Sequence, residues 1–273
     1  MSRISECFSR LARRRHSALI PFITAGDPSV PATVPMMHGL VESGADIIEL
    51  GVPFTDPMAE GPVIQRASER ALRGGSCMER TLMMVQRFRH HNSVTPVVLM
   101  GYANPIELIG YARFASFARE AGVDGVITVD MPPDEAEEYQ ECMRQQQLDT
   151  IYLVAPTSSP ERIQLIAQAG RGFIYYVSLK GVTGSDKLDV DSLAEKIKII
   201  RSYTQLPVGV GFGIKDAKTA GMIAKIADAV VVGSALIQRL EQGMEKGLSE
   251  APLVDYICEL IVSMRQAMDD FDE

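Results

Sequence analysis

The sequence predicts an α/β protein folded as a single (β/α)8 barrel of the TIM type that spans residues 1–273. Three observations predict it: eight short β-rich runs, helix-patterned stretches between them, and a length that suits a barrel of about 250 residues. Each run is about as long as a typical strand. The runs are ALIPFIT at 18–24, DIIELG at 46–51, PVVLMG at 96–101, DGVITVD at 124–130, TIYLVA at 150–155, GFIYYVS at 172–178, PVGVGFG at 207–213 and DAVVVG at 228–233.

The alternation of strands and helices favours a closed barrel over a doubly wound open sheet. Stretches such as VPMMHGLVESGA and SPERIQLIAQAG show helical patterns, with Ser, Asp or Pro at several starts and Gly at several ends. The strands are almost continuously apolar, which indicates parallel neighbours buried on both faces. An open sheet more often has about five or six strands and a Gly-rich turn after the first, where this chain has TAGDPS. We therefore expect the sheet to close into a barrel, with additional helices at residues 1–15 and near 64–73.

Composition and charge argue against several classes of function. The net charge is −8 and the pI is near 5.2, so the chain lacks the basic face of a nucleic-acid binder. No apolar segment is long enough to span a membrane, and the first residues lack the apolar core of a signal peptide. The four cysteines are scattered without disulfide-framework or metal-ligand spacing, which is typical of reduced thiols. We expect a cytoplasmic protein without nucleic-acid or membrane partners.

An acidic residue interrupts the second apolar strand. In IIELGVPFTDP, Ile47 and Glu49 share one face of the strand because side chains alternate, and Glu49 lies near its carboxyl end. Barrel enzymes carry their reactive groups at that end. Burial among apolar neighbours should raise the pKa of Glu49 towards neutrality, which suits a group that accepts and donates a proton. Capping of the next helix, or pairing with an arginine, is the structural alternative.

Two glycine-bearing turns predict a phosphate site. They follow the seventh and eighth strands, in GVGFGIKD and VVGSALI, and each leads into a helix. Backbone N–H groups and the helix dipole stabilise a dianion at such positions, where barrels often bind phosphate. After the sixth strand, the polar segment 178–192 has the length and glycine content of a lid over bound substrate. Tyr175 shares a strand face with Phe173, so its hydroxyl either reaches the site or completes the core.

Three other kinds of chemistry lack their residues. The four histidines all fall away from strand ends, which argues against a metal-dependent aldolase. A Schiff-base mechanism needs a desolvated lysine, whereas Lys180 lies in the expected lid and Lys215 in the turn beside the expected phosphate. No glycine-rich dinucleotide fingerprint is present. We therefore expect no metal and no redox cofactor.

Six motifs spread over about residues 20–235 carry a resemblance to one enzyme family. They are PFITAGDP, IIELGVPFTDP, GPVIQRA, MGYANPI, YYVSLKGVTG and VGFGI, and several fall at the expected strand ends. Over nearly its whole length the sequence resembles the tryptophan synthase alpha chain. The resemblance implies reversible retro-aldol cleavage of indole-3-glycerol phosphate to indole and glyceraldehyde 3-phosphate, a lyase reaction of tryptophan biosynthesis, with no cofactor bound to this chain.

The same resemblance assigns the catalytic residues. It implies that Glu49 is the acid-base group, that Glu60 is the second catalytic carboxylate, and that Thr183 on the lid orients Glu49. The family usually has aspartate where this chain has Glu60, in PMAEGP. The added methylene lengthens the side chain by about 1.5 Å, one C–C bond, and a misplacement of about 1 Å can cost about 100-fold in rate. We therefore predict that this loop is displaced or that the chain alone turns over slowly.

Further residues are implied to bind the substrate, and we also count Tyr175 among them. The residues implied to bind the phosphate are Gly184, Gly213, Gly233 and Ser234. The residues implied to line the indole pocket are Phe22, Leu99, Tyr102, Ile127 and Phe212.

The resemblance also implies a partner. The family works with a beta chain that holds pyridoxal phosphate, in a complex of two alpha and two beta subunits, and loop 53–62 usually faces that partner. Two alternatives remain open: an isomerase that uses Glu49 as a base on a sugar phosphate, and a mainly regulatory alpha-type subunit with catalysis weakened by Glu60. The apolar pocket argues against the first, and the retained Glu49, lid and phosphate turns argue against the second.

Overall fold

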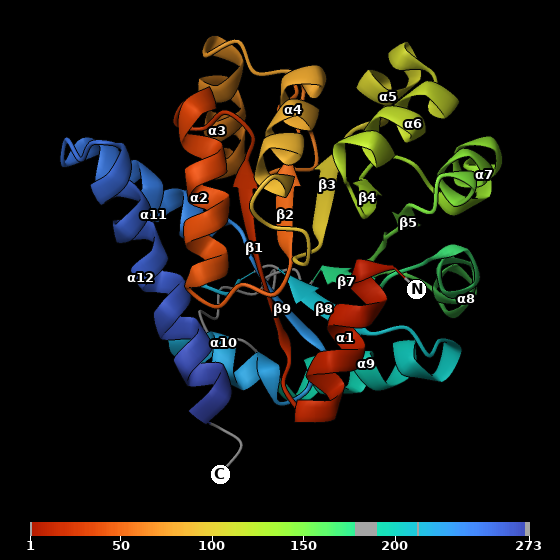
Figure 1. The fold of residues 1–273 in the computed structure, drawn as a ribbon. Coiled ribbons are helices and arrows are strands. Elements are labelled where there is room, and N and C mark those ends of the chain that lie inside the picture. The colour runs from red at the N-terminus through yellow and green to blue at the C-terminus, as the bar shows by residue number, and fades with distance from the viewer. Residues whose placement is uncertain (1, 178–189, 212, 271–273) are drawn as a thin grey trace.

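One parallel sheet closes into a barrel in the part of the chain that the structure describes (Figure 1). The computed structural model describes residues 2–177, 190–211 and 213–270. The strand order around the sheet is β5-β4-β3-β2-β1-β9-β8-β7-β6. The strands are β1 Ala18–Thr24, β2 Ile48–Gly51, β3 Val97–Gly101, β4 Gly125–Thr128, β5 Asp149–Thr150, β6 Tyr152–Val154, β7 Ile174–Val177, β8 Val208–Gly211 and β9 Ala229–Val232.

The fifth expected strand is divided into β5 and β6, and this division closes the barrel. β5 pairs with β4 on one side, β6 pairs with β7 on the other, and only Ile151 lies between them. The Ile151 N–H donates to the Val126 carbonyl at 3.0 Å, which keeps the intervening residue against β4. The segment 149–154 thus joins both ends of the sheet. The predicted (β/α)8 barrel is confirmed, because the nine described strands occupy the eight predicted positions.

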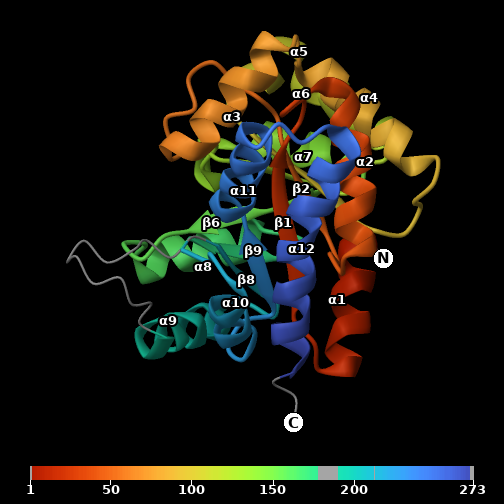
Figure 2. The same ribbon diagram turned by 90° about the vertical axis from the view of Figure 1, so that its left-hand side faces the viewer.

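Helices surround the barrel (Figures 1 and 2). They are α1 Arg3–Arg14, α2 Val30–Glu42, α3 Pro62–Arg73, α4 Met78–Arg89, α5 Ala103–Ile109, α6 Tyr111–Ala121, the 3-10 helix η1 Pro133–Glu135, α7 Glu137–Gln145, α8 Pro160–Ala169, α9 Val190–Tyr203, α10 Ala217–Ala224, α11 Ser234–Glu245 and α12 Glu250–Asp269. The two additional helices that the sequence predicts are present as α1 and α3. None of the helices in the described ranges is long and apolar enough to cross a membrane.

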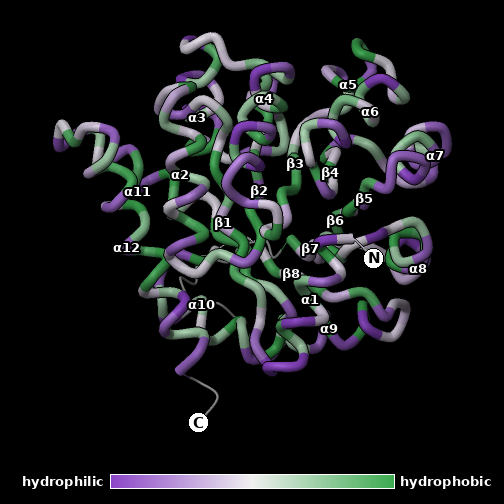
Figure 3. The backbone as a smooth tube through the Cα atoms, viewed as in Figure 1, coloured by the Kyte–Doolittle hydropathy of each residue, from purple (hydrophilic) through white to green (hydrophobic). Residues whose placement is uncertain are grey.

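Two apolar layers hold the barrel together, and the central strands are correspondingly hydrophobic (Figure 3). The larger layer lies between the strands and the surrounding helices and includes Ile48, while the smaller fills the barrel interior and includes Ile47. Neighbours along a strand fall in different layers because side chains alternate. Complete burial of one such side chain stabilises the fold by about 1.5–3 kcal/mol. Both faces of the strands are therefore packed against apolar layers, which explains why the strands are apolar at nearly every position.

Helix α1 closes the amino end of the barrel. Its buried residues Ile4, Phe8 and Leu11 join the apolar cluster of the barrel interior. The ring centroids of Phe8 and Phe173 are 5.7 Å apart. In the part of the chain that the structure describes, α1 thus covers the end of the barrel opposite to the carboxyl ends of the strands.

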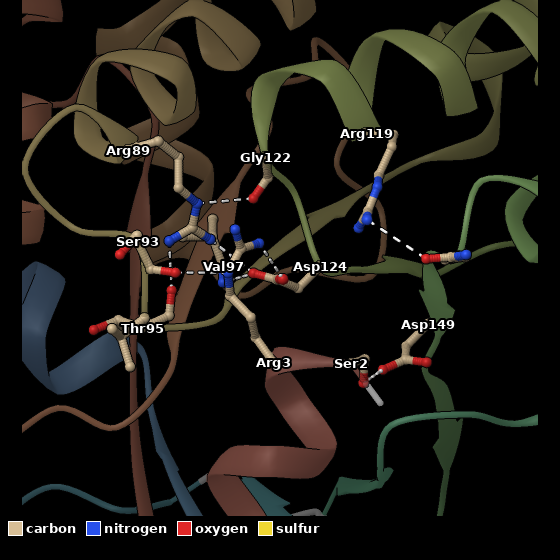
Figure 4. Close-up of polar contacts among 12 residues, drawn as sticks. Ser2, Arg3, Arg89, Ser93, Thr95, Val97, Arg119, Gly122, Asp124 and Asp149 are labelled. Atoms are coloured by element: carbon tan, nitrogen blue, oxygen red, sulfur yellow. Dashed lines mark hydrogen bonds and ion pairs between the residues drawn. The ribbon is translucent and has the colours of Figure 1, made fainter.

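Two arginines and one buried aspartate fix α1 in place (Figure 4). Arg3 of α1 and Arg89 of α4 converge on the carboxylate of Asp124, at 2.8 and 2.7 Å. Asp124 also accepts the Val97 N–H at 2.8 Å, and Arg89 donates to the carbonyls of Gly122 and Thr95. The carboxylate and Arg89 are thus nearly fully hydrogen-bonded, the condition under which buried charge is tolerated.

Candidate active site

Glu49 lies inside the carboxyl end of the barrel. It sits on β2 between Phe22 of β1 and Val98 of β3, and only 1% of its surface is exposed. Burial, with a smaller contribution from the charge of Glu60, raises the pKa of Glu49 from its ordinary 4.5 to about 8. Its Oε2 has no hydrogen-bond partner among the described residues, so no arginine or helix terminus of that part holds this oxygen. Glu49 is therefore mostly a neutral acid at pH 7, with one oxygen available to a ligand.

Glu60 lies in the loop between β2 and α3 and lines a small cavity at the carboxyl end of the barrel. Burial raises its pKa to about 7, and its charge contributes to the raised pKa of Glu49. The loop is anchored on both sides of this residue. Gln65 of α3 donates through Nε2 to the Glu60 carbonyl at 2.9 Å, and the Ala59 N–H donates to the Tyr102 hydroxyl at 3.0 Å. These anchors fix the backbone from which the Glu60 carboxyl reaches into the barrel.

Tyr175 contributes a hydroxyl to the same place. Burial and the charges of Glu49 and Glu60 raise its pKa well above the ordinary value of 10.0. The hydroxyl also lies against β8, because a Cβ atom added to Gly211 would be only 2.2 Å from it. The Tyr175 ring also packs against the apolar cluster of the barrel interior, with its centroid 6.4 Å from that of Phe173, so both roles that the sequence left open for Tyr175 stay open.

An apolar wall borders the carboxyl groups. It encloses a cavity of about 10 Å³, roughly room for one water molecule. Phe54 and Tyr102 stack within it, with ring centroids 5.1 Å apart. An indole ring does not fit this cavity, so binding there requires side chains of the wall to move. The lining residues are Phe22, Thr24, Gly51, Val52, Phe54, Pro57, Glu60, Ile64, Ser68, Met100, Gly101 and Tyr102.

The predicted pocket residues fall in several places. Phe22 and Tyr102 line this cavity, and Ile127 lies in the barrel interior. The prediction for Leu99 is wrong: its side chain lies in the layer between sheet and helices, whereas Met100 lines the cavity. The error is one position along a strand whose side chains alternate. The predicted residues Thr183, Gly184 and Phe212 lie outside the described residues, as does most of the expected lid 178–192.

Two residues that the sequence analysis missed shape the site. Thr24 is buried, and its Oγ1 has no partner among the described residues. Like Oε2 of Glu49, it is a polar atom that a bound substrate can satisfy, and orphaned polar atoms concentrate at functional sites. Gly51 gives room to Phe22, since an added Cβ would lie 2.5 Å from the Phe22 ring. Thr24 is two residues from Phe22, so strand alternation was a signal for it.

The two expected phosphate turns both lie at the carboxyl end of the barrel. Gly213 follows β8 with a φ of 80°, a conformation that favours glycine. Gly233 precedes α11, whose first residue is Ser234, and no side chain caps this helix. A Cβ on Gly233 would lie 3.8 Å from Ile64 of α3, so this turn borders the apolar wall. The arrangement leaves a helix N-terminus beside Phe22 and Ile64, which suits an anionic end of the substrate.

Comparison with known proteins identifies the family. The profile described as "Tryptophan synthase alpha chain" matches residues 8–266. The chain belongs to the tryptophan synthase alpha chain family. It is 55% identical to the alpha chain of Nitrosococcus oceani over 269 residues, covering 98% of both chains. It is 56% identical to that of Chromobacterium violaceum over 265 residues, covering 97% of this chain and all of the relative.

Solved structures of tryptophan synthase agree with this assignment. The alpha subunit of Legionella pneumophila str. Paris superposes with a TM-score of 0.92 at 45% identity, covering 99% of both chains. A structure titled as tryptophan synthase from M. tuberculosis in an aminoacrylate-bound form superposes with a TM-score of 0.86 at 36% identity, covering 98% of this chain and all of that one. Alpha chains of tryptophan synthase are lyases that cleave indole-3-glycerol phosphate in tryptophan biosynthesis, so the reaction that the resemblance implied is confirmed for the family to which this chain belongs.

The described residues hold no group of three or more His, Cys, Asp or Glu side chains with the geometry to bind a metal ion.

Proposed function

We propose that Glu49 and Glu60 perform the proton transfers of the retro-aldol reaction of tryptophan synthase alpha chains. One observation carries the proposal. Two carboxyl groups lie at the carboxyl end of a barrel, with pKa values raised to about 8 and about 7 and with one buried oxygen unpartnered among the described residues. Groups with such values exchange protons readily at neutral pH.

The reaction breaks the bond between indole C3 and the first glycerol carbon. In the proposed sequence, neutral Glu49 protonates indole C3, because the ring otherwise leaves as an unstable carbanion. Glu60, whose pKa of about 7 allows it to ionise near neutral pH, accepts a hydrogen bond from the indole N–H and stabilises the ring as it is protonated. The C3–C1 bond then breaks, the glycerol hydroxyl becomes the aldehyde, and its proton returns to Glu49. Products are indole and glyceraldehyde 3-phosphate, with no net uptake of protons.

Binding of the two ends of the substrate is proposed as follows. Gly213, Gly233 and Ser234 contact the phosphate through backbone N–H groups and a hydroxyl, and Gly184 joins them from the lid. Phe22, Tyr102, Ile127 and Phe212 line the indole pocket together with Met100. Tyr175 contacts the substrate near the carboxyl groups, and Thr183 orients Glu49.

We also propose that the chain acts without a cofactor of its own, as one barrel domain of residues 1–273 in the cytoplasm, with a beta chain in an assembly of two alpha and two beta subunits. Pyridoxal phosphate belongs to the beta chain. Loop 53–62 is the proposed contact, because Met58 at its tip is 91% exposed. On the adjoining helix α5, Leu108 is 83% exposed. We propose that these two exposed apolar side chains contact the beta chain.

The test is indole release from indole-3-glycerol phosphate by the purified chain, with and without a matching beta chain. We expect slow cleavage by the chain alone and faster cleavage once the complex forms. Failure to cleave in either case, while the complex still forms, would contradict the proposal. That result would support the regulatory alternative, in which Glu60 has weakened the chemistry.

A further inference from the structure

An ion-pair network joins α3 to α11 beside the site. Glu241 of α11 accepts two bonds from Arg66, at 2.9 and 2.6 Å, and a third from Arg70 at 2.6 Å. Arg70 also donates at 2.7 and 2.9 Å to Asp27, a fully buried carboxylate in the loop after β1. Paired, charge-assisted bonds of this kind are strong and directional. The network therefore fixes α3 relative to both α11 and the first strand-helix loop.

The two helices carry opposite ends of the proposed site. Helix α3 begins two residues after Glu60, and its Gln65 bonds the Glu60 carbonyl. Helix α11 begins with Ser234, at the proposed phosphate site. Ala67 of α3 and Ile237 of α11 are buried in one small apolar cluster, and the two helices pack together (Figure 2). Polar and apolar contacts thus join α3, which holds Glu60, to α11, which begins at the proposed phosphate site.

We propose that Glu241 is a positioning residue, which sets the distance between Glu60 and the phosphate site by holding Arg66 and Arg70 of α3 against α11. The inference rests on the proposed function. The glycerol chain of the substrate spans only a limited distance between the phosphate and the indole N–H, so Glu60 meets the indole only if α3 keeps its place on α11. Glu241 stays ionised for this role, because its bonds with Arg66 lower its pKa.

The variant Glu241→Gln tests the role. It keeps the side-chain shape but loses the charge. Arg70 keeps its ion pair with Asp27, so this arginine is not left without a carboxylate partner. We expect kcat for indole-3-glycerol phosphate cleavage in the complex to fall by about tenfold, since misplacement by about 1 Å costs up to 100-fold. The KM should change by less than about threefold, because ground-state binding is kept. A second variant, Arg66→Gln, should lower kcat similarly, and the double variant should be no worse than either single one.

A matched control is Glu259→Gln. This change removes the ion pair between Arg239 of α11 and Glu259 of α12, which is of the same kind and on the same helix but faces away from α3. We expect it to change kcat by less than about twofold. The positioning role would be wrong if Glu241→Gln and Arg66→Gln both had the same kcat as this control. It would also be wrong if they changed only the KM or only the thermal stability. Wild-type chain that cleaves no substrate would instead overturn the proposed function itself.

Discussion

Glu49→Gln lowers kcat for indole-3-glycerol phosphate cleavage by about 10³-fold, within the range that general acid-base groups contribute. Glutamine keeps the shape and neutrality of the protonated acid, but its amide protons are too weakly acidic to be transferred to indole C3. Substrate should still bind, because the phosphate turns and apolar wall are untouched. The measurement is single-turnover cleavage in the complex, alongside a Kd for glyceraldehyde 3-phosphate that we expect within about threefold of wild type.

Stability supplies the control for this variant. The pKa of Glu49 in the folded chain, about 8, is above its ordinary 4.5, so the folded state binds the proton more tightly. The stabilisation is complete below pH 4.5 and is lost as pH rises through 8. One pKa unit corresponds to about 1.4 kcal/mol, so wild type should lose a few kcal/mol relative to Glu49→Gln between pH 5 and 8.5. A variant that is active within tenfold of wild type, or that unfolds at pH 7, would contradict the catalytic assignment.

Glu60→Gln is expected to lower kcat by about 100-fold, again with little change in substrate affinity. An amide oxygen accepts a weaker hydrogen bond from the indole N–H than a carboxylate does. Glu60→Asp is the more informative variant. Because Gln65 and Tyr102 anchor the backbone on either side of Glu60, the aspartate carboxyl should fall short by about 1.5 Å and lower kcat by at least about tenfold.

The opposite result with aspartate would be decisive. If Glu60→Asp raised kcat, the native glutamate would be too long for its loop, and the regulatory alternative would gain support. Glu69→Gln is a suitable control, since Glu69 is an exposed residue of α3 that pairs with Arg73. That variant should have wild-type kinetics.

The barrel was predictable because its signals are local. Eight apolar runs and the helical patterns between them mark the strands and helices. Only a few sheet topologies are compatible with parallel strands that alternate with helices. The division of the fifth strand at Ile151 was not predictable, because it depends on β4 and β7 lying on either side of one short segment. Such pairing joins residues far apart in sequence.

The site was predictable where a residue is anomalous in its own strand. Glu49 is such a residue, since a carboxylate in an apolar run at a strand end has few roles. Leu99 and Met100 are both apolar, so their residue types gave no reason to prefer either for the pocket. Only the orientation of β3, which decides which side chains point into the barrel, distinguishes them. The bond between Arg66 and Glu241 spans 175 positions in the chain, and neither residue differs from an ordinary solvated charge when read locally.

Glu49 is proposed to be a proton donor that burial holds neutral. Its protonation state can be followed directly by infrared difference spectroscopy of wild type against Glu49→Gln, through the carboxylic-acid stretch between pH 5 and 9.5. We predict one buried acid that is fully protonated at pH 6 and titrates near pH 8. A carboxylate already ionised at pH 6 would contradict this role, because Glu49 would then have no proton to give to the indole ring.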